Sequence, residues 1–364
     1  MTTGRRWLLV AVGFALLIGT PLAVRALPAN DADIGARMLL EQVEGSADAP
    51  YSGYVETRGT LQLPVSDSFT DVGALFGERT RMRVWWRSSE DWRVDKVLTT
   101  GETDLFHDAG GTTTWEYEKS LITRTGDPRI RLPRTSDLLP PELAGRLLED
   151  VEVDELSRLP AEKVAGRDAQ GLRLVPGAPQ SSIDHVDLWV DPASGHALSV
   201  AVYAKGEETA AFTSTFMTFS DDIPSSAHTG VSSPPGAEFD YEDVLDIADV
   251  ANQYAPFTPP RTLAGLESSA DAQLRGVGVY GRGITQMIAI PLWGEAAEPL
   301  REQMQITFGT RQVDEGHVLT VGPLGILLTG VPDDEGGWLV AGPVTEQTLR
   351  RAARDVERSQ AGLR

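Results

Sequence analysis

The residues that could do chemistry are few, and none of them falls into a pattern that a reaction needs. Five histidines are spread over the chain, and none has the spacing of a zinc-binding helix. His185 and Asp187 would share one face of a strand, as two metal ligands can, but a solvated polar pair is the simpler interpretation. No Gly-x-Ser-x-Gly segment is present, and no serine has an identifiable base partner. The sequence therefore predicts a protein that is not an enzyme, with no catalytic residue, metal site or cofactor.

Two further segments are similar to functional motifs but do not meet the structural requirements of those motifs. Residues 276–281 have the glycine spacing of a dinucleotide fingerprint, but that fingerprint needs a helix to begin inside it, and residues 284–290 are typical of a strand. The acidic segment 150–155 lacks the glycine that a calcium loop requires at its sixth position. The chain has no cysteine, which excludes disulfides, thiolate zinc sites and cysteine nucleophiles.

A set of aromatic and aliphatic side chains remains as the candidate site. Most simply they form an ordinary core between a sheet and its helices. A strongly bent sheet with few covering helices would instead leave an apolar hollow, where an acyl chain of about 16 carbons would gain on the order of 12 kcal/mol at ~0.8 kcal/mol per methylene. The set comprises Tyr51, Val55, Leu61, Leu63, Met82, Val84, Trp86, Trp92, Val94, Leu98, Trp115 and Tyr117.

Charge limits the partners of such a site. The 364 residues include 53 acidic and 32 basic side chains, for a net charge of −21. This surface repels phosphate backbones, so nucleic acid is not expected as a partner. It also opposes broad adsorption to anionic lipids, so any lipid contact is expected through a shielded apolar site.

The N-terminal segment predicts export. Arg5 and Arg6 precede an apolar run over residues 7–20, which is the pattern of a signal peptide. We expect residues 1–29 to be either cleaved or kept as a membrane anchor, with the remaining chain outside the cytoplasmic membrane.

Beyond the leader, the pattern predicts an α+β protein dominated by one antiparallel sheet. A helix capped by Asp31 or Asp33 precedes a long strand over residues 51–63, a run of strands with arginine on the opposite face, and a strand over 163–175. The Ser/Pro/Gly-rich stretch 223–237 predicts a linker, and an acidic helix is expected over 239–254. The chain is long enough for a second, smaller α+β domain over 238–364.

Three segments carry a family resemblance: Tyr51-Ser52-Gly53-Tyr54-Val55, residues 164–174, and Val186-Asp187-Leu188-Trp189-Val190-Asp191 with its hairpin. Residues 31–222 resemble the LolA-like lipoprotein-carrier superfamily. The two-domain layout is similar to the RseB/MucB regulators of envelope-stress sigma factors. The resemblance implies a curved antiparallel half-barrel with covering helices that binds lipoprotein acyl chains, followed by a small RseB-like domain.

These observations predict an extracytoplasmic envelope protein that binds a lipid or lipoprotein. It would act as a carrier, or as a sensor and regulator of a membrane signalling partner. The expected partners are an acyl chain together with a membrane anti-sigma factor or an export transporter. Two alternatives stay open: a protein-interaction module with a filled core, and a hydrolase with an unrecognised site.

Overall fold

The computed structural model describes residues 28–61, 70–127, 131, 133–232, 235–242, 259–269, 276–330 and 336–361. The predicted leader therefore lies outside the described residues, apart from its last two positions. Within the described part of the chain, no helix is long and apolar enough to cross a membrane.

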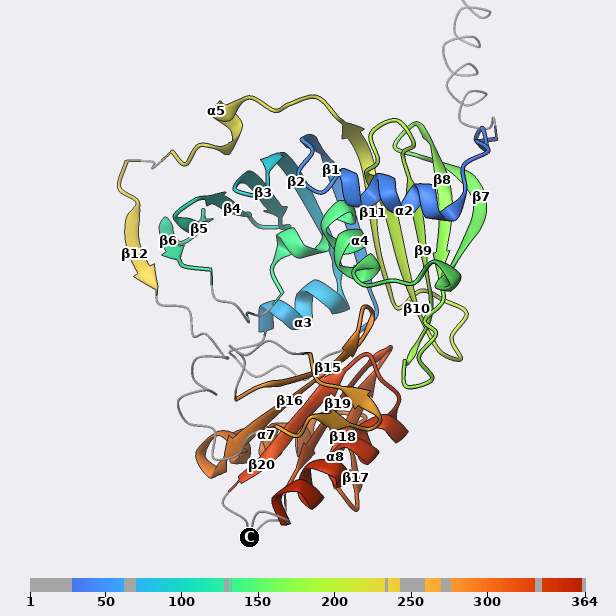
Figure 1. The fold of residues 1–364 in the computed structure, drawn as a ribbon. Coiled ribbons are helices and arrows are strands. Elements are labelled where there is room, and N and C mark those ends of the chain that lie inside the picture. The colour runs from blue at the N-terminus through green and yellow to red at the C-terminus, as the bar shows by residue number, and fades with distance from the viewer. Residues whose placement is uncertain are drawn as a thin grey trace, which may run out of the picture.

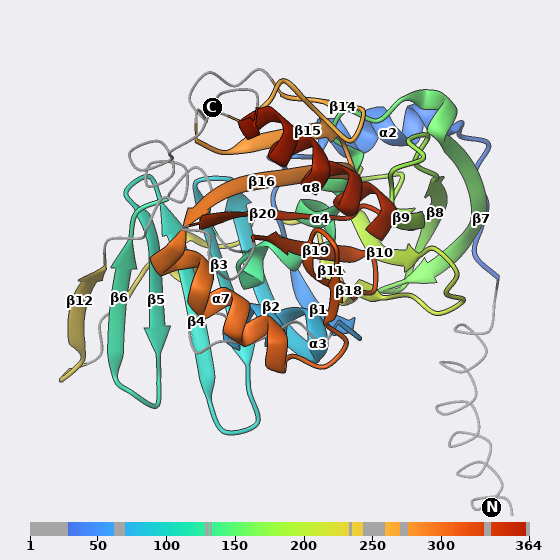
Figure 2. The ribbon, with the colours of Figure 1, turned by 90° about the horizontal axis from the view of Figure 1, so that it is seen from below.

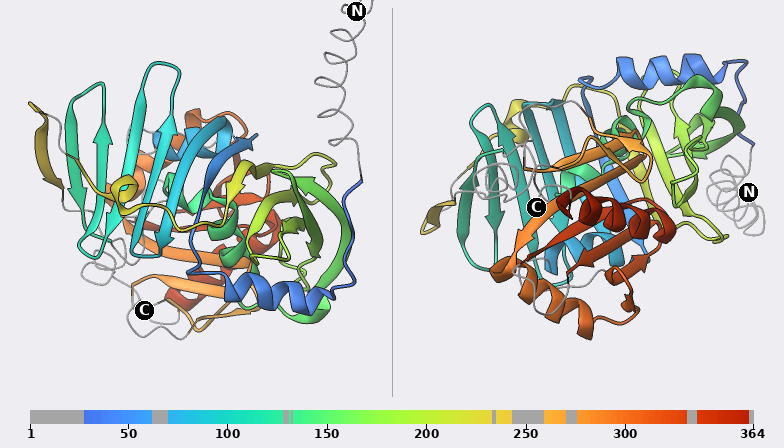
Figure 3. Two further views of the ribbon diagram at one scale, coloured as in Figure 1. Left: turned by 90° about the horizontal axis from the view of Figure 1, so that it is seen from above. Right: turned by 60° about the horizontal axis from the view of Figure 1, so that its bottom comes forward.

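One large sheet of twelve strands dominates the first part of the chain, and it bends into an open half-barrel (Figures 1 and 3). The strand order is β12-β6-β5-β4-β3-β2-β1-β11-β10-β9-β8-β7, and every neighbouring pair is antiparallel except β12 and β6. The predicted α+β fold with a curved antiparallel half-barrel is confirmed. The strands are β1 (Tyr51–Gly59), β2 (Arg79–Ser88), β3 (Asp91–Val97), β4 (Glu102–Asp108), β5 (Gly111–Glu116), β6 (Leu121–Thr125), β7 (Leu156–Val164), β8 (Arg167–Leu174), β9 (Ile183–Val190), β10 (Ala197–Ala204), β11 (Phe212–Ser220) and β12 (Glu238–Glu242).

Short helices cover the inner face of this sheet. Figure 1 shows α4 lying between the two wings of the bend, with α2 beside it. Their buried leucines and alanine join the strand residues of β8, β9 and β10 in one core cluster. The helical elements are α2 (Ala36–Gly45), α3 (Thr70–Gly77), the 3₁₀ turns η2 (Thr135–Leu138) and η3 (Val153–Glu155), α4 (Pro140–Leu148) and α5 (Ser226–Thr229).

The start of α2 differs from the prediction, because neither aspartate caps it. The N-cap is Gly35, which makes no side-chain cap bond. Asp31 instead pairs with Arg158 of β7 at 2.7 Å. The residues before the helix therefore run extended along the sheet.

Two strand predictions need correction. The single strand expected over 163–175 is two strands, because Ala165 and Gly166 both adopt positive φ (50° and 82°) and turn the chain between β7 and β8. The helix expected over 239–254 is wrong at its start, where β12 pairs with β6; residues 243–258 lie outside the described residues. The alternation of acidic and aromatic residues in β12 has the period of a strand.

The predicted hairpin after β9 is confirmed. Gly195 has φ +79° and donates its N–H to the carbonyl of Asp191 at 2.8 Å. A Cβ at this position would lie 2.4 Å from the carbonyl oxygen of Gln42 in α2. Glycine is thus required both by the turn and by the close approach of the helix.

The residues predicted as a linker lie along the outer face of the sheet. We call residues 221–232 the strap. Its helix α5 contacts β2 and β3, with the ring of His228 stacked on Trp85 at 5.6 Å between centroids. Arg87 donates to the carbonyl oxygen of Pro224 at 2.6 Å. The strap is therefore fastened to the half-barrel by several contacts.

The C-terminal part is a second, six-stranded sheet with a helix on each face (Figure 2). Helix α8 buries Leu349, Ala352 and Val356 against one face, and Met304 of α7 packs on the other. The glycine-rich segment 276–281 runs into a tight turn between two strands, so no helix begins there. The elements are β13 (Thr262–Leu263), β14 (Leu266–Glu267), β15 (Gly278–Arg282), β16 (Thr285–Trp293), α7 (Gly294–Ile306), β17 (Arg311–Val313), β18 (Gly316–Val321), β19 (Leu324–Thr329), β20 (Gly336–Gly342) and α8 (Glu346–Ala361).

Main-chain and charged contacts join the two parts. Thr345 donates its N–H to the carbonyl of Gln180 at 2.8 Å. Arg282 binds Glu155 at 2.8 Å and the carbonyl of Asp150 at 2.8 Å. The acidic segment 150–155 is therefore an anchor for an arginine of the second part.

Truncating the half-barrel core should be costly. Leu188→Ala removes a side chain with no exposed surface from the cluster beneath α2 and α4, so we expect a loss of about 2–5 kcal/mol in the free energy of unfolding. Urea denaturation followed by circular dichroism measures this loss. Leu98→Ala, at a side chain that is 43% exposed, is the control and should change stability much less. Equal losses for both would contradict this placement of the core.

Candidate functional site

Four rings form a stacked row across the inner face of the half-barrel. Strand register places Tyr51 opposite Trp86, Trp86 opposite Trp92, and Trp92 opposite His107. The successive centroids are 5.6, 5.3 and 5.1 Å apart, with interplanar angles of 9°, 2° and 13°. Residues opposite one another in antiparallel strands share a face, so the row runs straight across β1 to β4. We call these four residues the aromatic row.

Aliphatic side chains of the predicted set lie beside the aromatic row. Val55, Met82, Val84 and Val94 are 0–1% exposed and belong to the same cluster as three of the rings. Leu61 is also buried, at 6%. Leu63 lies outside the described residues. The sequence pattern thus brought together most of the predicted set.

Three members of the set lie elsewhere. Trp115 pairs with Asp104, which alternates with the inward-facing Leu105, so Trp115 lies on the outer face. Tyr117 follows the end of β5 and is 67% exposed, and Leu98 is 43% exposed. The prediction placed them inside because alternation within one strand cannot fix its phase relative to neighbouring strands.

The inner face at the aromatic row is filled. A cavity that admits water would leave exposed area on the side chains around it. Tyr51 is 1% exposed, while Trp86 and Trp92 are 4% and 5% exposed. Leu138 and Leu139 pack in the same cluster and are 0–1% exposed. In the part of the chain that the structure describes, these side chains are covered by the protein itself.

The cover over this face is η2 followed by α4, which we call the lid. Inside it, the side chain of Asp137 is 6% exposed and binds residues of the lid and of the segment just before it. Asp137 accepts hydrogen bonds from Arg131 at 2.5 Å, from Arg146 at 2.6 Å and from the N–H of Arg134 at 2.7 Å. Burial alone would raise the pKa of Asp137, but these arginines outweigh it and the pKa lies below its ordinary value. The stabilisation by Asp137 is therefore present above the ordinary carboxylate pKa and is lost as pH falls through the lowered value.

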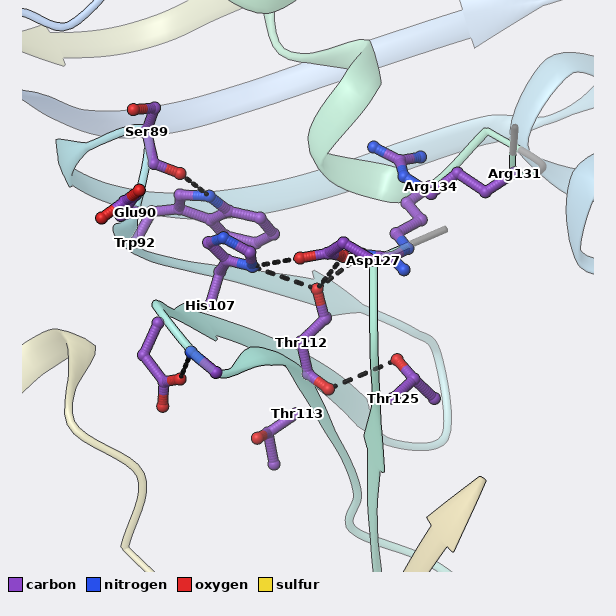
Figure 4. A network of polar contacts seen from close by, with 12 residues as sticks. Ser89, Glu90, Trp92, His107, Thr112, Thr113, Thr125, Asp127, Arg131 and Arg134 are labelled. Carbon is purple, nitrogen blue, oxygen red and sulfur yellow. Dashed lines mark hydrogen bonds and ion pairs between the residues drawn. The ribbon is translucent and has the colours of Figure 1, made fainter. Parts of the chain in front are cut away.

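A polar network connects the start of the lid with the end of the aromatic row (Figure 4). Arg134 donates to Thr112 at 2.5 Å and to Asp127 at 2.7 Å. The Nδ1 atom of His107 lies 3.2 Å from the Thr112 hydroxyl and 3.4 Å from Asp127. Because Arg134 directly precedes η2, a displacement of the lid would disturb the contacts of His107.

Polar atoms without partners lie under the lid. The hydroxyl of Tyr51, the indole N–H of Trp86 and the hydroxyl of Thr57 are buried and make no hydrogen bond with the described residues. Glu142 of α4 has a pKa raised to about 7, first by burial and then by Asp137 and Asp48. Buried donors in an apolar setting normally have acceptors, so these three groups are exceptions to that rule.

The outer face of the same strands carries ion pairs. Asp95, 1% exposed, binds Arg93 at 2.5 Å and Arg83 at 3.4 Å, and Arg93 also binds Asp104 at 2.7 Å. Asp95, Glu102 and Asp104 lie close enough together to resemble a metal site, but the two arginines occupy that space. The arginines on this face of the strands therefore pair with acidic side chains.

The contacts of His185 and Asp187 are those of a polar pair at the surface rather than of a metal site. Their Nε2 and Oδ2 atoms are 3.7 Å apart. Arg173 holds Asp187 with two hydrogen bonds of 2.6 and 2.7 Å. The carboxylate is thus already engaged by a cation.

Sequence reasoning missed the residues that fasten the lid. No sequence motif singles out Asp137, Arg131 or Arg134, and His107 is only one of five histidines without zinc-site spacing. The local signal was weak: an aspartate three residues after Arg134, at the start of a helical segment, can accept a backbone N–H there. The link between His107 and Arg134 depends on strand pairing.

Comparisons with known proteins bear on the layout. No protein-family model matches the chain, and no curated protein matches it in sequence. The MucA/MucB complex structure from Pseudomonas aeruginosa aligns at a TM-score of 0.48 with 16% identity, covering 87% of this chain and 96% of that one. Over this span the chain is similar in layout to that structure.

Smaller structures align with part of the chain. A putative outer membrane lipoprotein-sorting protein domain from Vibrio parahaemolyticus aligns at a TM-score of 0.22 with 16% identity, covering 48% of this chain and 74% of that one. A LolA superfamily protein from Nitrosomonas europaea aligns at a TM-score of 0.20 with 14% identity, covering 52% and 96%. At these values the alignments carry no argument, and function is argued from the residues of this chain.

The raised pKa of Glu142 predicts a pH-dependent cost. Between its ordinary pKa and about 7, the folded protein binds more protons at this site than the unfolded chain, so stability falls as pH rises. Glu142→Gln should remove that fall and raise the free energy of unfolding on the order of 1–3 kcal/mol at about pH 8. Urea denaturation at about pH 5 and about pH 8 measures it. The exposed Glu41→Gln is the control, and a variant that follows the wild-type pH profile would contradict the assignment.

Removing the charge of Asp137 should loosen the lid more than it loosens the sheet. Asp137→Asn removes the charge that Arg131 and Arg146 bind, at an expected cost of about 1–3 kcal/mol. Hydrogen exchange should accelerate in residues 135–148 more than in β9 and β10. Asp108→Asn, at another arginine-paired carboxylate, serves as the control. Uniform acceleration over the sheet would show that Asp137 supports the whole domain.

Proposed function

We propose that this chain is an extracytoplasmic envelope protein of the carrier or regulator type. Its inner sheet face would bind the acyl chain of a lipid or lipoprotein when the lid lifts. The observation that carries the proposal is the aromatic row, buried beneath a lid whose attachment depends on a cluster of ion pairs. The proposal needs no catalytic group.

The shape of the binding surface favours an acyl chain. The aromatic row and its aliphatic neighbours make a continuous apolar strip that spans four strands. In the closed form, Leu138 and Leu139 occupy this strip. An acyl chain would replace Leu138 and Leu139 with a similar apolar surface, provided that Ala144 and Leu148 of α4 stay packed in their own cluster.

The unpaired polar atoms suit the other end of such a ligand. The hydroxyl of Tyr51 and the indole N–H of Trp86 are both donors, and their rings stack on each other. An ester or amide carbonyl near the head of a lipidated molecule supplies the acceptor. Binding would thus satisfy two donors that the closed form leaves without partners.

The lid gives the closed and open forms separate stabilising contacts. The contacts of Arg134 with Thr112 and Asp127 hold the closed form at the margin of the strip, whereas the ligand would bind at its apolar centre. A binding site that is mostly closed lowers the apparent affinity in proportion to the open population. A partner that competes for these charges could then open the lid.

A second candidate is a protein-interaction module with no lipid ligand. The filled inner face favours it, because the side chains at the row line no open space. In that case the partner would be an envelope protein such as a membrane anti-sigma factor or an export transporter, and the lid would be a permanent part of the core.

A fluorescent fatty acid distinguishes the two candidates. Trp92→Glu should abolish its binding, because it places a charge in the strip. Trp115→Glu, at a tryptophan on the outer face, is the matched control and should leave binding intact. Asp137→Asn should tighten binding about threefold or more by raising the open population.

Native mass spectrometry of protein purified from its host provides the second measurement. Co-purified lipid that is lost in Trp92→Glu supports the carrier or regulator with a lipid ligand. Absence of lipid, no displacement of the fluorescent probe, and no effect of Asp137→Asn would together favour the interaction module.

A further inference from the structure

The last strand of the large sheet has an open side. β12 lies at the end of the sheet, beyond β6 (Figures 1 and 2), and no described residue pairs with its other edge. All five residues of β12 are exposed, with Phe239 at 49% and Tyr241 at 75%. Two large apolar side chains on an unpaired edge are unusual for a strand that only closes a sheet.

The pairing with β6 fixes which main-chain groups are free. Glu238 donates its N–H to the carbonyl of Ser120 at 2.9 Å. In a parallel pair, one strand uses every second residue for the ladder, so Asp240 and Glu242 also direct their main-chain groups to β6. Phe239 and Tyr241 therefore direct their N–H and C=O groups away from the sheet, where an added strand can bind them.

The side chains of β12 divide by charge between its two faces. Glu238, Asp240 and Glu242 lie on one face, because they alternate with the two aromatic residues. The rings of Phe239 and Tyr241 lie on the other face, 5.0 Å apart. The edge thus presents an acidic row and an aromatic pair in strand period.

A pocket adjoins the aromatic side of this edge. Phe239 lines it together with Phe106 and Arg124 of the sheet and with Thr229 and Val231 of the strap. Its volume is about 510 Å³, which is room for more than one large side chain. The pocket thus lies between the strap and the strands β4 to β6, behind the ring of Phe239 and away from the free edge.

We propose that the free edge of β12 is a docking site for an extended segment of another protein, in which basic residues alternate with apolar ones. The basic residues would lie beside Glu238, Asp240 and Glu242, and the apolar ones beside Phe239 and Tyr241. A second copy of β12 does not fit, because its acidic row would lie opposite an identical one. The proposal does not depend on acyl binding, since β12 pairs only with β6, and β5 separates β6 from β4, where the aromatic row ends.

Synthetic peptides of about nine residues test the charge pattern. A labelled peptide of alternating lysine and valine should bind the full chain in an anisotropy assay, and one of alternating glutamate and valine should not. Glu238→Lys, Asp240→Lys and Glu242→Lys combined should weaken the lysine peptide about tenfold or more and allow the glutamate peptide to bind. Glu207→Lys, Glu208→Lys and Glu302→Lys combined make the same charge change at other exposed positions and should have little effect. Equal losses in both triple variants would overturn the proposal in favour of non-specific attraction.

Strand addition is tested separately through the main chain. Tyr241→Pro removes an outward N–H without removing a hydrogen bond to β6, and it should abolish peptide binding. Tyr241→Ala keeps that N–H and should retain part of the binding, which separates the main chain from the ring. Hydrogen exchange should slow at the amides of Phe239 and Tyr241 when the lysine peptide binds. Binding without that slowing, or binding that survives Tyr241→Pro, would refute strand addition.

Discussion

The structure of this protein depends on covering the apolar inner face of a bent sheet. Opposite residues on neighbouring strands share a face, so the rings of Tyr51, Trp86 and Trp92 gather on the concave side in one row. Left open, that row would expose several hundred Å² of apolar surface. The lid covers it with Leu138 and Leu139, and the proposed function is an exchange of that cover for a ligand.

The lid is attached differently at its margin and at its centre. Its centre is held by apolar burial, which an acyl chain can replace. Its margin is held by the contacts of Arg134 with Thr112 and Asp127, while Asp137 with Arg131 and Arg146 holds the lid itself together. These charged contacts respond to pH and to charged partners, whereas the apolar contacts do not. The lid can therefore stay closed without a ligand and still open when pH or a charged partner weakens the contacts at its margin.

The outer face follows from the same alternation. Strand positions between the inward apolar residues carry arginines and acids, and Asp95 is buried in their midst with two arginine partners. The strap crosses this face, with His228 on Trp85, and leads to β12. This path places β12 at the far edge of the large sheet, where its acidic and aromatic side chains are exposed.

The sequence by itself determined the alternation of the strands, the hairpin at Gly195, the rejection of the glycine-rich segment and the assembly of the inner set around Trp86 and Trp92. These features depend on neighbours in sequence, and period 2 is visible there. Tertiary structure decided the face of Trp115, the strand character of β12 and the attachment of the lid through Asp137. Each of these depends on a pairing that the local pattern does not specify: Trp115 with Asp104 of the neighbouring strand, β12 with the distant β6, and Asp137 with Arg131 and Arg146, six and nine positions away. Alternation gives the relative order of side chains within a strand, but only pairing between strands fixes which face is inside.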